Sequence, residues 1–361
     1  MEELVGLRRS LHKHPEIAFH ELETRAIIKA FVTERAGLFE PFYDGQCGLV
    51  FVKRCKDKPK KTVAFRAEMD GLPVKDEKKT DYASLNPGYC HSCGHDAHMA
   101  MLLSAMEKIN DAELENELVC IFQAGEEVFG GAKYLMEKIS NLSIDYLFGM
   151  HITPDMKAGS FSIAAGEMMA SSYTAEVQLN LACSHVGQGA DRLEIFNLLY
   201  EAANQFNNDT QLMKIPHIRD NGYYNVNASE ITLCINIRSF LEKDWKSEII
   251  KLVKRISDKA ALNNATFKEI SYYPILINTE SATRKATEII GKCGGNLVEA
   301  PRSYSSDDFA FYRNRIKETA YFFIGCYLGP EHQCHTASFD LDESCLAHGE
   351  GVIVELFNST F

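Results

Sequence analysis

The sequence predicts an α/β protein whose sheet is mostly parallel, and two observations support this. Short apolar runs at 62–67, 118–122 and 146–150 predict buried strands. Segments with helical periodicity follow at about 97–109 and 130–139. Strands that alternate with helices in this way are typical of a parallel sheet covered by helices.

The flanking segments extend the same architecture. Residues 2–35 have the apolar spacing of helices, interrupted at Pro15, and residues 49–53 predict a further strand. Near the other end, 281–291 predicts a helix and 321–326 a buried strand. Helical residues then continue to about Phe357.

The pattern changes after about residue 171, which predicts an inserted second domain. Strands and helices follow in the order β-α-β-β-α-β, which is the ferredoxin-like unit. We expect strands at 173–179, 217–224, 230–238 and 266–273, and helices at 191–208 and 243–263. The sequence therefore predicts one discontinuous domain, 1–170 with 275–361, and an inserted α+β domain, 171–274.

Composition excludes several classes of protein. The chain has 361 residues, of which 45% are hydrophobic and 24% charged, and its net charge is −12. Without a basic block, neither nucleic acid nor an anionic membrane is an expected partner. No signal peptide or membrane-spanning apolar stretch is visible. Eleven scattered cysteines favour free thiols in a reducing cytoplasm.

Residues 90–98, Cys-His-Ser-Cys-Gly-His-Asp-Ala-His, concentrate side chains that bind transition metals. Gly94 separates Cys93 from His95, and a glycine there allows a turn that directs both side chains to one point. Two alternatives are open. Cys90 and Cys93 have the spacing of a redox pair at a helix start. The loop could also be polar without a role.

Further metal-competent residues follow predicted strands. Glu126 and Glu127 come after the run at 118–122, His151 ends the next strand, and His335 follows the last one. The loops after parallel strands meet at one edge of a sheet. With Cys93 and His95, five ligands and one spare carboxylate suit two metal ions and a general base.

The motifs together resemble a known family. Arg66–Pro73 (RAEMDGLP), His91–His98 (HSCGHDAH), Phe122–Glu127 (FQAGEE), Gly149–His151 (GMH), Ser306–Phe309 (SDDF), Cys334–Phe339 (CHTASF) and Leu11–Glu16 (LHKHPE) appear in order. The chain resembles the aminoacylase, hippurate hydrolase and indole-acetyl-amino-acid hydrolase branch of the twentieth metallopeptidase family. That resemblance implies a zinc-peptidase-like three-layer domain with a ferredoxin-like lid, which commonly mediates dimers.

The resemblance also implies roles for single residues. It makes Glu126 the proton shuttle and Asp70 an acid that orients a ligand imidazole. It implies that the metal ligands are Cys93, His95, Glu127, His151 and His335.

Positions in and near the implied lid have weaker counterparts in the family. Asn225 and Arg238 match positions associated with binding the substrate carboxylate. Asp307 stands where the family motif has Glu, which could alter specificity. His185 matches a histidine that can steady the oxyanion, although the usual glycines before it are missing.

The expected function is a binuclear metal-dependent hydrolase of small N-acyl amino acids. The ions would be zinc or manganese, with nickel or cobalt also suited to the ligand set. A cytoplasmic homodimer joined through the lid is the expected assembly. Alternatives are a dipeptidase or carboxypeptidase with the same centre, a thiol redox protein using Cys90 and Cys93, and a catalytically silent ligand-binding relative.

Overall fold

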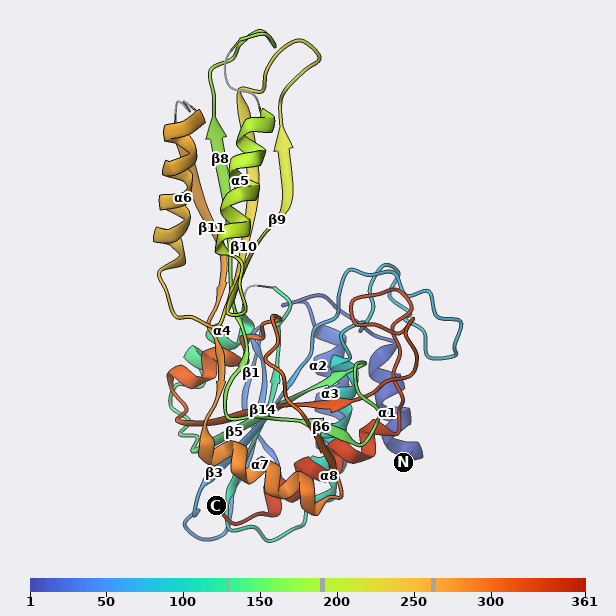
Figure 1. Ribbon diagram of the computed structural model, residues 1–361. Helices are drawn as coiled ribbons and strands as arrows, with labels where there is room; N and C mark the ends of the chain where they lie inside the picture. Colours follow the sequence, from blue (N-terminus) through green and yellow to red (C-terminus); the bar gives the residue numbers. More distant parts are fainter. Residues whose placement is uncertain (129, 189–191, 261–263) are drawn as a thin grey trace. The chain divides into compact units, whose positions relative to one another are not determined.

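The computed structural model describes residues 1–128, 130–188, 192–260 and 264–361, which divide into two compact units (Figure 1). The first unit comprises Met1–Met168, Ile277–Pro301 and Asp308–Phe361, and the second comprises Met169–Leu276 and Arg302–Asp307. The short segment 302–307 therefore belongs with the second unit, whereas the sequence pattern assigned it to the first. Within the described residues, no helix is long and apolar enough to cross a membrane.

An eight-stranded sheet forms the centre of the first unit, in the order β1-β2-β4-β3-β5-β14-β6-β13. The four central strands β4, β3, β5 and β14 run parallel, as predicted. The strands are β1 (Glu40–Gly45), β2 (Gly48–Lys53), β3 (Thr62–Glu68), β4 (Glu117–Gln123), β5 (Tyr146–Thr153), β6 (Ser160–Ser162), β13 (Asn296–Val298) and β14 (Glu318–Gly325). The sequence pattern missed β1, β6 and β13, because β1 is polar and partly exposed and the other two have three residues each.

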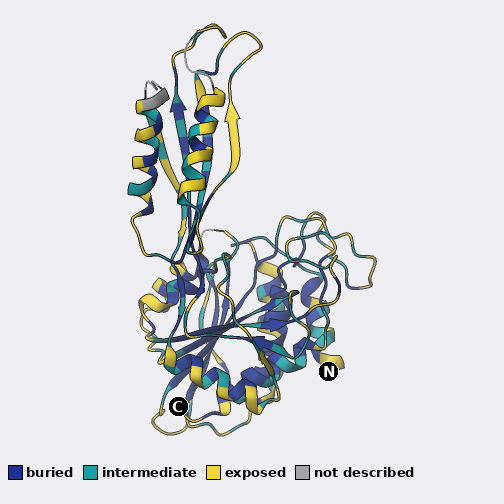
Figure 2. Cartoon of the chain, in the orientation of Figure 1, coloured by how far each residue is buried: buried dark blue, intermediate teal, exposed yellow. Residues whose placement is uncertain are grey.

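Helices cover both faces of this sheet. On one face a single apolar core is shared by α1 (Glu2–His12), α2 (Leu22–Arg35), α3 (His95–Lys108), α7 (Glu280–Lys292) and α8 (Cys345–Asn358). Alternate strand residues such as Val63, Phe65 and Ala67 enter this core. On the other face α4 (Gly131–Lys138) contacts β4, and the 3₁₀ helix η1 (Asp308–Asn314) contacts β14. Figure 2 shows the sheet buried between these layers.

Helix α3 is buried along almost its whole length, from His95 to Met106. Between its first and last turns its sequence is apolar apart from Ser104, which agrees with a helix enclosed by protein. The first turn therefore presents His95 from inside the core rather than from a mobile loop.

The second unit is an antiparallel sheet, ordered β11-β8-β10-β9, with two helices packed against it. Its elements are β8 (Ser171–Asn180), α5 (Arg192–Phe206), β9 (Gln211–Asp220), β10 (Glu230–Ser239), α6 (Trp245–Ala260) and β11 (Asn264–Tyr273). This is the predicted β-α-β-β-α-β order. Residue 191 of one predicted helix and residues 261–263 of the other lie outside the described residues.

One predicted strand of the second unit was misplaced. The segment expected at 217–224 is β9, which begins at Gln211 and ends at Asp220. The strand stops at Asn221 and Gly222, and residues 223–226 then form a turn in which Tyr223 and Val226 exchange backbone hydrogen bonds. β7 (Gly166–Met169) and β12 (Leu276–Asn278) form a separate two-stranded sheet.

Candidate metal centre

Six metal-competent residues predicted from the sequence come together in the first unit. Two of them follow β4, one lies near the end of β5, one follows β14 and two lie at the start of α3, as expected for one edge of a parallel sheet. Three overlapping groups each place their ligand atoms within 4.8 Å of one another: Cys93 with His95 and His151, Cys93 with Glu127 and His335, and His95 with Glu126 and Glu127. We call Cys93, His95, Glu126, Glu127, His151 and His335 the six-residue cluster.

The Cys93 thiol is at the middle of the cluster. Its Sγ atom lies 3.2 Å from Nε2 of His151 and 3.3 Å from Nε2 of His335. The same His335 nitrogen lies 3.4 Å from a carboxylate oxygen of Glu127. Thiolate, imidazole and carboxylate at this spacing form the mixed ligand set that suits zinc and neighbouring transition metals.

Two unusual backbone conformations shape the cluster. Gly94, between Cys93 and His95, has a φ of 82°, and a Cβ atom there would lie 2.1 Å from Cδ1 of Ile152. His335 has a φ of 64°, which is uncommon for a residue with a side chain. Its N–H donates to the carbonyl of Ser92 at 2.7 Å, so the loop carrying His335 is fixed to the loop carrying Cys93.

Asp70 contacts the cluster through both its carboxylate and its backbone carbonyl. Its carboxylate accepts the backbone N–H groups of Glu126 at 3.1 Å and Glu127 at 2.9 Å. The imidazole of His95 instead donates from Nδ1 to the backbone carbonyl of Asp70 at 2.8 Å, while the nearest carboxylate oxygen is 3.6 Å away. The Asp70 carboxylate thus orients the Glu126–Glu127 backbone, and its carbonyl orients the ring.

The hydrogen bond from Nδ1 leaves Nε2 of His95 directed into the cluster. Within the described part of the chain this buried nitrogen has no hydrogen-bond partner. Burial alone would lower the pKa of His95, but Asp70, Glu68 and Glu127 outweigh it and raise the pKa to about 10. A buried nitrogen that lacks a partner and is surrounded by negative charge fits a bound cation.

Two other members of the cluster, Cys93 and His151, also have shifted pKa values. A contact with the Cys334 thiol, burial and the charge of Glu127 raise the pKa of Cys93 well above its usual range. Burial lowers the pKa of His151 to about 3. A neutral imidazole is the form that ligates, and a nearby cation is what would make a thiolate of Cys93 favourable.

A further pair beside the cluster was not predicted. Glu68 accepts a hydrogen bond from Nδ1 of His98 at 2.7 Å, and both side chains are buried. Glu68 also pairs with Arg66, whose guanidinium contacts Asp308 at 2.5 Å. Arg66 and Glu68 belong to the Arg66–Pro73 motif of the sequence. Two charged residues at alternate positions of an otherwise apolar strand were the signal for a buried ion pair.

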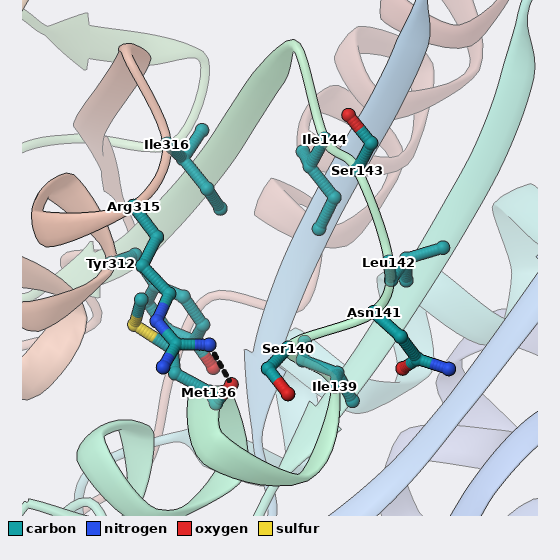
Figure 3. Close-up of a pocket in the computed structure, with 10 residues that line it drawn as sticks. All are labelled: Met136, Ile139, Ser140, Asn141, Leu142, Ser143, Ile144, Tyr312, Arg315 and Ile316. Carbon is teal, nitrogen blue, oxygen red and sulfur yellow. Dashed lines mark hydrogen bonds between the residues drawn. The ribbon is translucent and has the colours of Figure 1, made fainter.

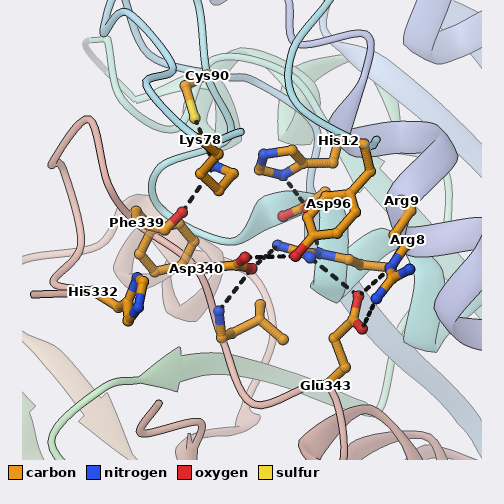
Figure 4. A network of polar contacts seen from close by, with 12 residues as sticks. Arg8, Arg9, His12, Lys78, Cys90, Asp96, His332, Phe339, Asp340 and Glu343 are labelled. Carbon is orange, nitrogen blue, oxygen red and sulfur yellow. Dashed lines mark hydrogen bonds and ion pairs between the residues drawn. The ribbon is translucent and has the colours of Figure 1, made fainter. Parts of the chain in front are cut away.

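A second buried network anchors the first turn of α3 (Figure 4). Asp96, next to His95, pairs with Arg8 at 2.7 Å and with Nδ1 of His12 at 2.7 Å. Arg8 also contacts Asp340 and Glu343, each at 3.2 Å. Helix α1 and the segment before α8 therefore hold the first turn of α3 in place through Asp96.

Cys90 belongs to this network rather than to the six-residue cluster. It is buried, and its thiol lies near His12 and Asp76, which with it could hold a cation. The Lys78 ammonium, however, lies 3.0 Å from Asp76 and 3.7 Å from the Cys90 sulfur, so positive charge is already present there. Cys90 and Cys93 are both free thiols.

The remaining predicted residues belong to the second unit. His185 and Asn225 are exposed on adjoining loops, joined by the hydrogen bond from the N–H of Val186 to the carbonyl of Asn225 at 3.0 Å. Arg238 donates to Asn236 at 2.9 Å and to Ser306 at 2.8 Å. Asp307, which follows Ser306, is buried.

A cavity elsewhere in the first unit does not share this chemistry (Figure 3). It encloses about 290 Å³ between the end of α4, the loop before β5 and the end of η1. Its lining contains no His, Cys, Asp or Glu, and consists of Met136, Ile139, Ser140, Asn141, Leu142, Ser143, Ile144, Tyr312, Arg315 and Ile316. The six-residue cluster is therefore the candidate active site.

Comparisons with known proteins agree with this site. The model of peptidase family M20/M25/M40 matches residues 64–359. The chain is 27% identical to an N-acetylcysteine deacetylase of Bacillus subtilis, over 98% of this chain and 95% of that protein. It is 27% identical to IAA-amino acid hydrolase ILR1-like 4 of Arabidopsis thaliana, over 96% of this chain and 83% of that one.

A solved structure agrees over the same extent. The Bacillus subtilis YXEP protein, described as a dinuclear metal-binding peptidase of the M20 family, superposes with a TM-score of 0.84 at 25% identity. The match covers 98% of this chain and 96% of that one. The family and the fold class indicated by the sequence motifs are thus confirmed. The chain belongs to peptidase family M20/M25/M40, a family of metal-dependent hydrolases.

Proposed function

We propose that the protein is a binuclear metal-dependent hydrolase that cleaves the amide bond of small N-acyl amino acids. The observation that carries this proposal is the convergence of the six-residue cluster from segments spread between residues 93 and 335. The relatives named as a deacetylase of N-acetylcysteine and a hydrolase of IAA-amino acids support the substrate class.

Five members of the cluster would hold two divalent ions: Cys93, His95, Glu127, His151 and His335. The unpartnered Nε2 of His95 and the thiol at the centre of the cluster support this ligand set. Zinc and manganese are the first choices, and nickel or cobalt also suit imidazole with carboxylate and thiolate. When bound, two such ions lower the pKa of a water molecule and polarise the substrate carbonyl.

Glu126 would move the protons. Its backbone N–H is fixed by Asp70 next to Glu127, so the two adjacent side chains are free to take different roles. The Glu126 carboxylate takes a proton from water as its oxygen bonds to the carbonyl carbon. It then delivers that proton to the nitrogen as the C–N bond breaks, which yields a carboxylate and a free amine.

The second unit would supply substrate contacts. Arg238 is half-buried, and its fork of N–H donors suits the α-carboxylate of an amino acid, with Asn225 as a second donor. His185 would steady the oxyanion, and Asp307 would shape the acyl or side-chain subsite. In these roles the second unit acts as a lid.

The second unit would also join two copies of the chain. Strand β9 is an edge strand that is exposed from Pro216 to Asp220. Tyr223 and Tyr224 just beyond it are 71% and 91% exposed. An open strand edge beside exposed aromatic side chains is suited to pairing with a second copy. The free thiols favour a reducing compartment such as the cytoplasm.

The decisive experiment combines metal analysis with a substrate panel. N-acetyl, N-benzoyl and indole-acetyl amino acids are compared with dipeptides, with and without chelator. We expect hydrolysis of acyl amino acids that chelator abolishes and zinc or manganese restores. Preference for dipeptides would indicate a dipeptidase or carboxypeptidase instead. Activity indifferent to chelator and lost in Cys90→Ser would indicate thiol chemistry.

Glu126→Gln tests the proton shuttle directly. We expect kcat to fall by about 10²- to 10⁴-fold with metal content unchanged, because the amide cannot accept the proton. Glu137→Gln, on the exposed side of α4, is the matched control and should keep full activity. Full activity in Glu126→Gln would rule out this assignment.

A further inference from the structure

Three consecutive backbone N–H groups in the turn after β4 are held by two buried carboxyl groups. Asp70 accepts those of Glu126 and Glu127, as described above. The third, that of Gly125, donates to Glu21 at 3.1 Å. Glu21 comes from the segment before α2, more than one hundred positions away in the sequence.

Capping of the helix that it precedes does not explain the burial of Glu21. It is only 2% exposed, and it stands at the N-cap position of α2 without making a side-chain cap hydrogen bond. The N-terminal amides of α2 are instead capped by Glu16, which accepts the N–H groups of Glu23 at 3.1 Å and Thr24 at 2.9 Å. A buried carboxyl group is unfavourable unless it is hydrogen-bonded, and the N–H of Gly125 compensates this one together with backbone groups of Phe19 and Glu21 itself.

Phe19, two residues before Glu21, packs against the same turn. Phe19 has a φ of 64°, in the left-handed region that a bulky residue seldom adopts. Its ring covers Gly125, whose own φ is 71°, and a Cβ atom there would lie 2.6 Å from the ring. Backbone strain of this kind persists where the surrounding structure imposes it, and it is common near functional sites.

The same segment also holds the turn that carries Asp70. The N–H of Gly71 donates to the carbonyl of Glu16 at 2.7 Å, and Ile17 pairs with Gly71 in a parallel bridge. Residues 16–21, which we call the brace, therefore contact both turns that orient Glu126 and Glu127. Burial and the charge of Asp70 raise the pKa of Glu21 to about 8, which agrees with a carboxyl group held close to a second one.

We propose that Glu21 is a positioning residue for the hydrolysis. By holding the N–H of Gly125 it fixes the backbone from which the Glu126 side chain extends toward the six-residue cluster. The proposal rests on the proposed function, in which Glu126 moves the protons. Glu21 itself touches neither substrate nor metal; it acts through the backbone of the turn.

Three variants distinguish an effect on the position of the turn after β4 from an effect on the stability of the protein. Glu21→Ala removes the acceptor, and Glu21→Gln keeps an oxygen that can accept the Gly125 N–H. Glu16→Ala, in the same brace, removes the two caps of α2 but leaves the turn after β4 untouched. We expect Glu21→Ala to lower kcat by about 10- to 100-fold, because small misplacements of a catalytic group have effects of this size. KM and metal content should stay within about twofold, and Glu21→Gln should restore most of kcat.

Amide hydrogen exchange of residues 125–127 provides a readout that needs no activity. In the metal-free protein, exchange should be faster in Glu21→Ala than in wild type, Glu21→Gln or Glu16→Ala. Unchanged exchange together with wild-type kcat in Glu21→Ala would overturn the proposal. So would a loss of kcat in Glu16→Ala equal to that in Glu21→Ala, since both would then reflect stability alone. If wild-type protein hydrolyses nothing, the proposed function fails, while the exchange result still decides the positioning of the turn.

Discussion

The Nδ1 atom of His98 lies 2.7 Å from a carboxylate oxygen of Glu68, and both side chains are buried. The other ring nitrogen accepts the backbone N–H of Ile152 at 3.0 Å, so the proton is on Nδ1. Ile152 directly follows His151. His98 therefore fixes the end of β5 at the point where His151 enters the six-residue cluster.

Replacing His98 by Ala should weaken metal binding. The change leaves the N–H of Ile152 without its acceptor and removes one partner of the buried Glu68 carboxylate. We expect metal affinity to fall by about 10- to 100-fold and the free energy of unfolding to fall by about 2 kcal/mol. Chelator competition and urea unfolding measure the two effects. His217→Ala, on exposed β9, is the control. Wild-type affinity in the His98 variant would contradict this role.

Asp308→Ala should be strongly destabilising. Its carboxylate accepts from Arg66, from the side-chain amide of Gln123 at 2.9 and 2.7 Å, and from the N–H of Ala132 at 2.8 Å. Removing it leaves a buried guanidinium with less compensating charge, which costs about 3 to 5 kcal/mol. Urea unfolding gives the value. Glu115→Ala, which breaks the exposed pair with Lys60, should lower the free energy of unfolding far less, because solvent screens that pair. Equal losses in the two variants would refute the prediction.

We expect the protein to become less stable in mild alkali, because His12 loses its proton there. Burial opposes the charged form, but Asp96 and Asp76 raise the pKa of His12 to about 9 from an ordinary 6.5. A raised pKa gives stability that is complete below about pH 6.5 and is lost as pH rises through 9. The loss should be roughly 3 kcal/mol. Unfolding free energies measured from pH 6 to 10 test this. In His12→Gln the decline over this range should be smaller by this amount, while the part that His95 contributes remains; an identical decline would assign it to another group.

Gly94→Ala should disrupt the metal site more than the strain from its positive φ alone would. The added Cβ atom would overlap Ile152, and the positive φ adds about 1 to 2 kcal/mol. Gly88→Ala is a matched control, because Gly88 has a φ of 86° with open space around it. We expect reduced metal content by elemental analysis in the Gly94 variant and normal content in the Gly88 variant. Full metal content in both would show that the loop shifts without cost.

Much of the fold could be predicted because the buried strands are short apolar runs and the helices are periodic. The six-residue cluster was predictable for a related reason: Cys93, Glu127 and His335 are unusual residues at the ends of such elements. Polar residues at the ends of parallel strands meet by topology, whatever the details of the loops.

Contacts made by backbone atoms could not be predicted in this way. The sequence motif indicated that Asp70 supports an imidazole, but not that its carboxylate also accepts the Glu126 and Glu127 amides, which no side-chain pattern reveals. The partners of Glu68 and Glu21 depend on tertiary packing between distant segments. Short edge strands such as β6 and β13 depend on pairing rather than on their own composition.

Strand β14 lies between β5 and β6 in the sheet, yet it follows them in the chain by more than 150 residues. During synthesis, a nascent chain that has completed β5 must therefore wait for Glu318–Gly325 to leave the ribosome. Until then the edges of β5 and β6 that pair with β14 have no partner, and open edges of this kind favour aggregation. A transcript truncated before residue 318 would thus yield an insoluble fragment rather than a smaller folded protein.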